Sequence, residues 1–290
     1  MPIKPSELIL NPDGSLYHLN LRPDHISDTV ILVGDQDRVD QVTKNFESIE
    51  FKIQKREFHT QTGTYHGKRM SVISTGIGTD NIDIVMNELD ALVNIDLKTR
   101  EIKDDVTSLE IIRIGTSGSI QEKVPIDSFL ISEYAVGFDG LLHFYDSERI
   151  QYKAISDAIV KQTNWMNGRS EPYVVKCDDG LFSKLYSEKT FKGFTATNVG
   201  FYGPQGRILR LPLLDDEIND KLNNFDYQGM AITNMEMETA AIYGLAQLMG
   251  HKAVSMNAII ANREIGEFTS DPHQLIDKLI EYTLNKLTTK

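Results

Sequence analysis

The segment LEIIRIGTSG, from Leu109 to Gly118, carries the clearest strand pattern in the chain. It begins as a short run of apolar, β-branched residues, as in a buried strand, and ends with two glycines separated by two hydroxyl residues. Arg113 interrupts the apolar run. Because a fully buried strand does not tolerate an unpaired charge, we predict that Arg113 has a partner elsewhere in the fold.

The same pattern recurs along the chain. The runs TVILVG (Thr29 to Gly34) and MSVISTG (Met70 to Gly76) are also short, apolar and closed by glycine. Further strands are predicted to begin at Ser128, Gly193 and Ala253, from their content of β-branched and apolar residues.

Helical patterns lie between some of these strands. Asp271 and Pro272 form an N-cap and first-turn pair for a final helix, and Gly250 marks the end of an earlier one. Strands that alternate with helices over the whole length predict an α/β layered fold with a central mixed sheet. No proline- or glycine-rich linker divides the chain, so we predict one domain over residues 1–290. The apolar positions of the two clearest helical stripes are Ile82, Val85, Leu89 and Leu92, and Leu275, Ile276, Leu279, Leu284 and Leu287.

Composition excludes several classes of protein. The chain has 290 residues, of which 40% are hydrophobic and 25% charged, with a formal net charge of -12. Binding to nucleic acid or to an anionic membrane depends on clustered Lys and Arg, so neither partner is expected. The single cysteine, Cys177, excludes an internal disulfide and favours a reducing cytoplasm. The N-terminal MPIKPSELIL lacks the apolar core of a signal peptide, and no apolar run reaches membrane-spanning length.

Three segments place an arginine beside a strand end or turn. They are GDQDR (Gly34 to Arg38), RIGTSG (Arg113 to Gly118) and KREF (Lys55 to Phe58). Glycine lets backbone amides approach an anion, and guanidinium groups match phosphate oxygens. We therefore predict a site for a small anion, although Arg38 alone could equally be a solvated residue. None of the segments is a Walker A or dinucleotide motif, so neither ATP nor NAD is expected.

A separate segment, FYGPQGR (Phe201 to Arg207), combines an aromatic ring, a glutamine and an arginine. Glutamine both donates and accepts hydrogen bonds, whereas arginine only donates. On one turn, Gln205 and Arg207 could bind a planar ring that carries alternating carbonyl and imide groups, with Phe201 as an apolar wall. By composition alone, an ordinary loop with an exposed arginine is the favoured alternative.

The segment TNMEMETAA (Thr233 to Ala241) holds two glutamates on either side of one methionine. Thr233 and Glu236 fit a capping box at a helix start, which leaves Glu238 unexplained. On a helix, residues two apart point in different directions, whereas in an extended segment they share a face. If the chain is extended before the helix, both glutamates can face one ligand; if the helix begins at Thr233, only one can.

Taken together, these segments resemble the purine nucleoside phosphorylase and uridine phosphorylase family, nearly from end to end. The resemblance implies a single α/β domain with a mixed, barrel-like sheet flanked by helices, assembled as dimers or as hexamers of dimers. It also implies cleavage of a nucleoside by orthophosphate to ribose 1-phosphate and a free base, without an organic cofactor. The matching blocks, in the family's order, are LYHLNL, ILVGDQDR, REFHTQTGTYHGK, STGIG, IIRIGTSGSI, FYGPQGR and NMEMETAA.

The resemblance also implies roles for individual residues. Arg56 and His18 are expected to reach the site from the neighbouring subunit, to phosphate and to the ribose 5′ hydroxyl respectively. An isolated His18 would more often be an ordinary surface or packing residue, so its role depends on the LYHLNL match. Within the subunit, phosphate is assigned to Gly34, Arg38, Arg113 and Thr116, and ribose to Glu236, Met237 and Glu238.

The base-binding block matches the uridine branch of the family. There, a glutamine and an arginine hold the uracil edge, which implies that Gln205 and Arg207 bind the base beside Phe201. Purine members use an aspartate near the end of a late strand, where this chain has Asn262 and Arg263. Arg263 resembles an arginine that supports the uracil-binding pair, or it is a surface residue. Uridine phosphorolysis, a pentosyltransferase reaction, is the predicted activity, and the residues predicted to carry catalysis are Arg113, Gln205, Arg207 and Glu238.

Departures from the family pattern leave alternatives open. Gln36 stands where proline is usual, and STGIGTDN (Ser74 to Asn81) replaces the commoner STGIGGPS. Some members bind potassium at the dimer interface through residues that match Glu57, Ile77 and Asn81. A purine nucleoside phosphorylase, a nucleosidase that uses water and a catalytically silent nucleoside-binding protein are the alternative functions. The choice among uridine, deoxyuridine and thymidine stays open, as does dimer versus hexamer.

Overall fold

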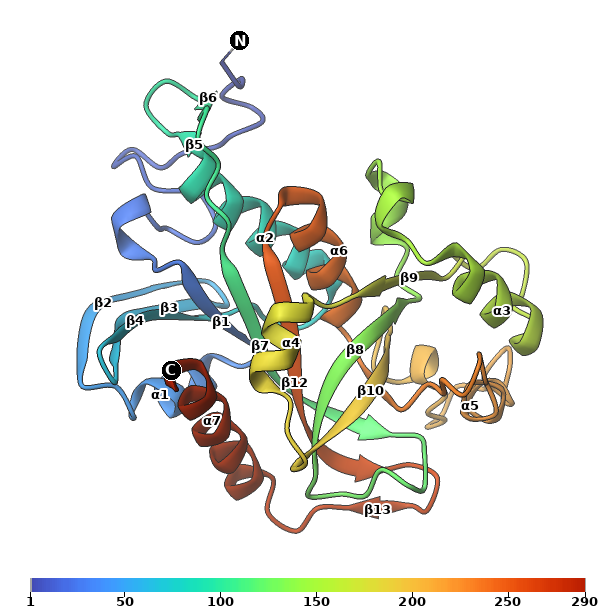
Figure 1. The fold of residues 1–290 in the computed structure, drawn as a ribbon. Helices are drawn as coiled ribbons and strands as arrows, with labels where there is room; N and C mark the ends of the chain where they lie inside the picture. Colours follow the sequence, from blue (N-terminus) through green and yellow to red (C-terminus); the bar gives the residue numbers. More distant parts are fainter. Residues whose placement is uncertain (1, 290) are drawn as a thin grey trace.

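The computed structural model describes residues 2–289 and is built around one mixed sheet of eleven strands (Figure 1). A separate two-stranded hairpin, β5 (Ile95–Asp96) and β6 (Glu101–Ile102), stands apart from it. The strands of the main sheet are β1 (Thr29–Val33), β2 (Ser48–Lys55), β3 (Phe58–Tyr65), β4 (Lys68–Ser74), β7 (Glu110–Ser119), β8 (Phe129–Gly137), β9 (Tyr173–Lys176), β10 (Thr190–Thr197), β11 (Asn234–Glu236), β12 (Lys252–Asn262) and β13 (Glu267–Phe268).

Part of this sheet closes on itself. Strand β12 pairs in parallel with β7 and antiparallel with β8, so the strands β12, β8, β10, β11 and β7 form a ring. From β7 the sheet continues as an open extension through β1, β4, β3 and β2. Figure 1 shows β7 and β12 side by side at the centre of the molecule. The predicted α/β fold with a mixed, barrel-like sheet is confirmed.

Helices pack around the sheet. In the described part of the chain, none of them is long and apolar enough to cross a membrane. Helix α6 contacts both α2 and strand β12, whereas α7 packs against β12 from another side. The helices are α1 (Gln36–Thr43), α2 (Thr79–Asn94), α3 (Lys153–Thr163), α4 (Asp179–Leu185), α5 (Ile218–Asn223), α6 (Thr239–Met249) and α7 (Pro272–Thr288), with single 3-10 turns η1 (Pro23–His25), η2 (Leu141–Phe144), η3 (Glu148–Ile150) and η4 (Gly203–Gln205).

The predicted elements form where hydrophobic patterning is strongest. All five residues of β1 are buried, as expected for a strand covered on both faces. The predicted stripes of α2 and α7 are buried as well. Asp271 caps α7 by accepting a hydrogen bond from the Gln274 amide at 2.9 Å, and α6 ends at Gly250, whose φ of 80° few other residues adopt without strain.

Two regions differ from the sequence prediction. Strands β2 and β3 were not predicted, because β2 alternates between exposed and half-buried residues and β3 is rich in threonine and other polar residues. The polar stretch 146–170, for which no helix was predicted, contains α3, whose Ile155 and Ile159 are buried in a second hydrophobic core. Polar composition therefore concealed elements that tertiary packing stabilises.

The capping-box interpretation of Thr233 is wrong. Residues Asn234–Glu236 form β11, which pairs with β10 and β7, and helix α6 begins only at Thr239. Sheet hydrogen bonds hold this segment extended, an effect that local capping rules do not include. The extended alternative is therefore the correct one, and Glu236 and Glu238 both line the same cavity.

Candidate active site

A cavity of about 1000 Å³ opens where loops after several strands meet. It takes residues from the turns after β1 and β4, from the end of β7, from the loop after β10, from β11 and from the end of β12. Segments that are far apart in sequence thus share one pocket. Eleven of the predicted site residues line it: Gly34, Arg38, Arg113, Thr116, Phe201, Gln205, Arg207, Glu236, Met237, Glu238 and Arg263.

Arg113 finds the partner that its buried position requires. Its Nη2 lies 2.6 Å from Glu238 Oε2 and 3.2 Å from Glu236 Oε2, and its Nη1 donates to Asn257 Oδ1 at 3.0 Å. All three charged residues are at most 6% exposed. Two carboxylates thus share one guanidinium deep in the cavity wall.

Gly115 makes room for this arrangement. The guanidinium of Arg113 folds over Gly115, and a Cβ at that position would stand 1.9 Å from Arg113 Nη1. Any side chain there would displace the arginine from the glutamates. The glycine that closes the strand pattern in the sequence is therefore required by a close approach of the Arg113 side chain, not by an unusual backbone angle.

The two glutamates have different surroundings. Glu236 accepts hydrogen bonds from the Thr239 amide at 2.9 Å and from the Thr197 hydroxyl at 2.6 Å, so it satisfies a free amide at the start of α6. Glu238 accepts from the Gly78 amide at 2.9 Å and otherwise faces Arg113. The Glu236 carboxylate thus accepts several hydrogen bonds from neighbouring amides and hydroxyls, whereas the Glu238 carboxylate accepts fewer hydrogen bonds from the protein.

Burial and neighbouring charges shift the pKa values of Arg113 and Glu238. Burial alone would lower the pKa of Arg113, but Glu236 and Glu238 together raise it above its ordinary value. Burial raises the pKa of Glu238, and the neighbouring Glu236 adds to this effect, while Arg113 opposes it. Arg113 therefore stays charged and opposes protonation of Glu238, whereas the neighbouring carboxylate of Glu236 makes that protonation easier.

Arg38 supplies a cation that is not neutralised by a carboxylate. It lies in α1, which begins behind the N-cap Asp35, and its Nη1 lies 3.5 Å from the Ile114 carbonyl. Burial lowers the pKa of Arg38, and nearby Arg113 lowers it further. Within residues 2–289, no carboxylate lies within 4.0 Å of its guanidinium. An anion bound between Arg38 and the loops would relieve this repulsion.

The other end of the cavity is built on η4 and the loop around it. Arg207 Nη1 donates to Gln205 Oε1 and to the Phe201 carbonyl, both at 2.6 Å, and its guanidinium carbon lies 3.8 Å from the centre of the Phe201 ring. Gln205 is only 2% exposed, whereas Phe201 is 50% exposed. The three residues that the sequence placed on one turn are thus in direct contact.

Arg263 holds this turn from the end of β12. Its Nη1 donates to the Gln205 carbonyl at 2.5 Å and approaches Met235 Sδ at 3.4 Å. Burial lowers the pKa of Arg207 to about 10, with a further contribution from Arg263, and burial also lowers the pKa of Arg263. Arg263 is half-buried in the site, so the alternative of a simple surface arginine does not describe it.

His18 and Arg56 lie outside the cavity of their own subunit. Glu88 of α2 accepts hydrogen bonds from the His18 amide at 3.0 Å and from the Leu19 amide at 2.8 Å, and it contacts His18 Nδ1 at 2.6 Å. Tyr17, which precedes His18 in the chain, connects His18 with Arg56. The Arg56 guanidinium lies 5.5 Å from the centre of the Tyr17 ring. The two residues predicted to serve a neighbouring subunit therefore lie close together.

The predicted potassium ligands also converge. Glu57, Ile77 and Asn81 all border the cavity, but Asn81 Nδ2 donates to the Ile77 carbonyl at 3.3 Å. The Ile77 carbonyl oxygen, one of the predicted ligands, thus already accepts a hydrogen bond within the subunit. Among the described residues, no group of three or more His, Cys, Asp and Glu side chains could hold a metal.

Two site residues were missed by sequence reasoning. Gly78 supplies an amide to Glu238, and Asn257 of β12 positions Arg113. Asn257 had a detectable signal, since it is a polar residue inside the apolar run AVSMNAIIA, as Arg113 is inside its own run. The Gly78 contact joins residues 160 positions apart, and no local pattern predicts it.

The chain is similar to known proteins over most of its length. Residues 28–285 match the family model described as the phosphorylase superfamily. A uridine phosphorylase from Thermococcus kodakarensis is 30% identical over 258 residues, which cover 88% of this chain and 80% of that protein. A purine nucleoside phosphorylase from Listeria welshimeri is 25% identical over 254 residues, covering 87% of this chain and 90% of that protein.

A solved structure shares the whole fold. A Trypanosoma brucei nucleoside phosphorylase, described as showing uridine phosphorylase activity, superposes with a TM-score of 0.87 at 29% sequence identity. The match covers 98% of this chain and all of the other. Similarity therefore extends over sheet, helices and the loops that form the cavity.

Proposed function

Because the chain belongs to the phosphorylase superfamily, we propose that it cleaves uridine with orthophosphate to give uracil and ribose 1-phosphate. The observation that carries the choice of uridine is the base end of the cavity, where Arg207 and Arg263 both contact Gln205. Two donors with no neighbouring carboxylate suit a ring that presents carbonyl oxygens.

The position of Asn262 supports the same choice. Purine members are expected to use an acid there to protonate the leaving base. In this chain Asn262 donates to the carbonyls of Gln121 and Val124, both at 3.1 Å, and accepts from the Glu264 amide at 3.1 Å. Asn262 is fully buried and serves the backbone around it, so it is not placed to act on a base.

In the proposed reaction, phosphate binds at the end of the cavity that holds Arg38 and Thr116. The Arg38 guanidinium and the backbone amides of the Gly34 turn supply donors for its oxygens. Arg113 stands at the boundary between phosphate and sugar, where Glu238 and Glu236 already hold it. Phosphate is the nucleophile, so the protein's main contribution is to align it with the anomeric carbon.

Glu238 and Met237 bind the ribose in this proposal. Glu238 accepts from the Gly78 amide at Oε1 and from Arg113 at Oε2 and is the carboxylate with fewer internal partners, so we assign to it the hydrogen bonds from the sugar hydroxyls. As the glycosidic bond breaks, the sugar gains positive charge, and an adjacent carboxylate stabilises it. Glu236 positions Glu238 by accepting a hydrogen bond from the Glu238 amide at 3.0 Å.

The departing uracil gains negative charge as the bond breaks. Gln205 and Arg207 bind the edge of the ring, and the cationic Arg207 stabilises the developing anion. Phe201 forms an apolar wall on which the Arg207 guanidinium is stacked. A donor already in place before the reaction avoids reorganisation and contributes a few kcal/mol at most sites of this kind, roughly a hundredfold or more in rate.

The complete site is proposed to need a second subunit. His18 and Arg56 extend from the same region, on the outside of their own subunit, and would enter the neighbour's cavity at the ribose and phosphate ends. A homodimer is then the minimum active unit, and a monomer should be nearly inactive.

Potassium at Glu57, Ile77 and Asn81 remains a prediction, and no step above depends on it. Location in the cytoplasm is likewise proposed, from the single, buried cysteine, Cys177.

The direct test is the release of uracil from uridine with and without phosphate. We expect release that requires phosphate and forms ribose 1-phosphate in equal amount. Faster release of hypoxanthine from inosine would replace the proposal with a purine phosphorylase. Release without phosphate would indicate a nucleosidase, and tight uridine binding without any cleavage would indicate a silent binding protein.

A further inference from the structure

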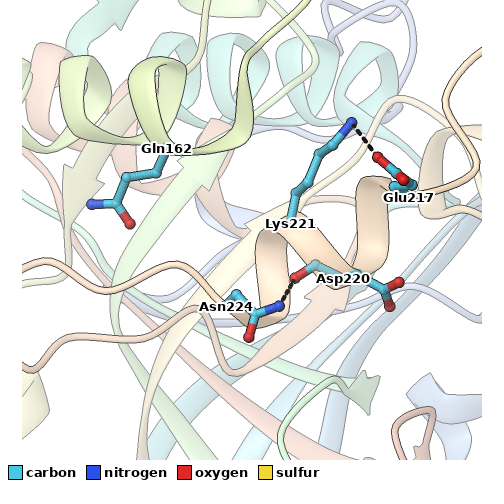
Figure 2. A pocket seen from close by; sticks show the side chains of 5 residues that line it. All are labelled: Gln162, Glu217, Asp220, Lys221 and Asn224. Atoms are coloured by element: carbon cyan, nitrogen blue, oxygen red, sulfur yellow. Dashed lines mark hydrogen bonds and ion pairs between the residues drawn. The ribbon is translucent and has the colours of Figure 1, made fainter.

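Helix α5 packs directly behind the loop proposed to bind the base. Ile218 and Leu222 anchor the helix in the second hydrophobic core. Other side chains of this segment are polar: Asp220 and Lys221 line a hollow together with Gln162 of α3 (Figure 2). The apolar side of α5 therefore fixes the helix in the core, and its polar side faces solvent.

Asn219 of α5 points to neither of these sides. It contacts Gly206, where a Cβ would stand 2.4 Å from the nearest atom of the Asn219 amide group, and Gly206 itself has a φ of 68°. This contact puts the Asn219 amide against the turn that carries Gln205 and Arg207. Gly206 is thus required both by its backbone conformation and by the approach of Asn219.

The groups around Asn219 determine how its amide is oriented. In the orientation that satisfies both ends, its nitrogen donates to the Gln205 carbonyl at 3.2 Å and its oxygen accepts from Arg263 Nη2 at 2.9 Å. The Gln205 carbonyl then receives two donors, since Arg263 Nη1 also contacts it at 2.5 Å. Asn219, Gln205 and Arg263 form a closed triangle of hydrogen bonds.

We propose that Asn219 is a positioning residue for base recognition. It holds the main chain of Gln205 and the guanidinium of Arg263 in one geometry, and it does so from a helix that is anchored in the core. The proposal rests on the function proposed above, because it assigns Asn219 a role through the base-binding turn. Asn219 would thus contribute to selectivity for the base although it does not itself touch the ligand.

The expected effect follows from what Asn219→Ala removes. Arg263 Nη2 loses its acceptor, and the Gln205 carbonyl loses one of two donors, so the turn becomes free to shift by fractions of an ångström. A hydrogen bond to a charged group contributes about 1.5–3 kcal/mol, which corresponds to a loss of roughly tenfold or more. We expect the loss in kcat/KM for uridine and in the affinity for free uracil, with the KM for phosphate unchanged.

Asn224→Ala is the matched control. Asn224 caps the same helix, is exposed, and donates only to the Asp220 carbonyl at 2.8 Å (Figure 2). This variant removes the same chemical group from the same segment without contacting the base-binding turn. Its kinetics should equal those of the wild type. If Asn219→Ala fails to fold, Asn219→Asp replaces it. The aspartate carboxylate cannot donate a hydrogen bond to the Gln205 carbonyl and would neutralise the charge of Arg263. The same uridine-specific loss is therefore expected.

The outcomes separate this inference from the function on which it rests. A wild-type enzyme that does not cleave uridine would overturn the proposed function before any variant is compared. A wild-type enzyme that cleaves uridine, with folded Asn219 variants of unchanged uracil affinity and kcat/KM, would overturn the role of Asn219 alone. A parallel loss in phosphate KM would also overturn it, because that result indicates general damage to the site. If inosine proves to be the substrate, the same loss is expected for inosine, since Gln205 still borders the cavity.

Discussion

The arginines at the two ends of the cavity have different kinds of partners. At one end, Arg113 lies inside β7 and pairs with Glu236 at the end of β11 and Glu238 at the start of α6, and all three have little exposure. At the other, Arg207 and Arg263 contact carbonyl groups, a sulfur atom and an aromatic ring, and no carboxylate of residues 2–289 pairs with them. With both carboxylates ionised, the first cluster carries an excess negative charge, whereas the second carries only positive charge.

This difference assigns each end a different task. A sheet-bound cluster with an excess carboxylate keeps its geometry and suits the sugar, which gains positive charge during the reaction. Arg207 and Arg263 are held by carbonyl groups, which do not cancel their positive charge. Their charge therefore acts on the ligand in the cavity and suits a ring that becomes an anion. Each of the following predictions tests one part of this contrast.

The largest effect is expected at the end that holds Arg113. Arg113→Met leaves Glu236 and Glu238 buried without their shared cation, and removal of one partner from a buried ion pair costs about 3–5 kcal/mol. We expect that loss in the free energy of unfolding, measured by urea denaturation, together with loss of activity. A variant as stable as the wild type would mean that the carboxylates are neutral in the native protein.

Glu238→Gln should separate catalysis from stability at the same end. Arg113 keeps Glu236 as its counterion, so the unfolding midpoint should change little. The sugar loses its carboxylate, and turnover of uridine should fall by roughly a hundredfold or more. Unfolding of this variant under conditions where the wild type is native would indicate that Glu238 is primarily structural.

Arg207→Ala tests the other end. Arg207 has no carboxylate partner to leave behind, so folding should be unaffected. Uridine turnover should fall by roughly tenfold to a thousandfold, because a donor to the leaving base is lost, while phosphate binding measured by calorimetry should survive. Unchanged kcat/KM for uridine would remove Arg207 from the site.

The smallest predicted effect is a pH dependence that arises from Glu238. Burial raises its pKa above the ordinary value of 4.5, so below that raised pKa the carboxylate is protonated and turnover should fall by about tenfold per pH unit. The sign for stability is opposite: a raised native pKa contributes stability that is fully present below the unfolded-state pKa and is lost as pH rises through the native pKa.

The two signs make this pH prediction measurable. On acidification, uridine turnover should decrease before the fluorescence of Trp165 reports any unfolding, and Glu238→Gln should lack this acid limb. Coincident loss of activity and structure in the wild type would assign the acid limb to unfolding and not to Glu238.

Much of the molecule was predictable from local patterns. The apolar runs that became β1, β4 and β7, the stripes of α2 and α7 and the stop at Gly250 follow from periodicity and turn chemistry. Strands β2 and β3 were not predicted, because their polar residues are stabilised by pairing with neighbours and not by burial of an apolar face.

The candidate site divides in the same way. Arg113 and the FYGPQGR turn stood out because charge in an apolar run and convergent polar groups are visible in the sequence. Asn219 and Gly78 gave no signal, since their importance arises from contacts with residues far away in the chain.

The sequence by itself determined the family, the α/β class, the buried strands and the residue types of the site, because these depend on composition and local spacing. Only the tertiary structure decided that Arg113 is shared by two glutamates and that the second of them starts helix α6 from an extended strand. The physical reason is that ion pairs and sheet hydrogen bonds join segments far apart in the sequence, such as Arg113 with Glu238 and β10 with β11. No short window of sequence contains both partners.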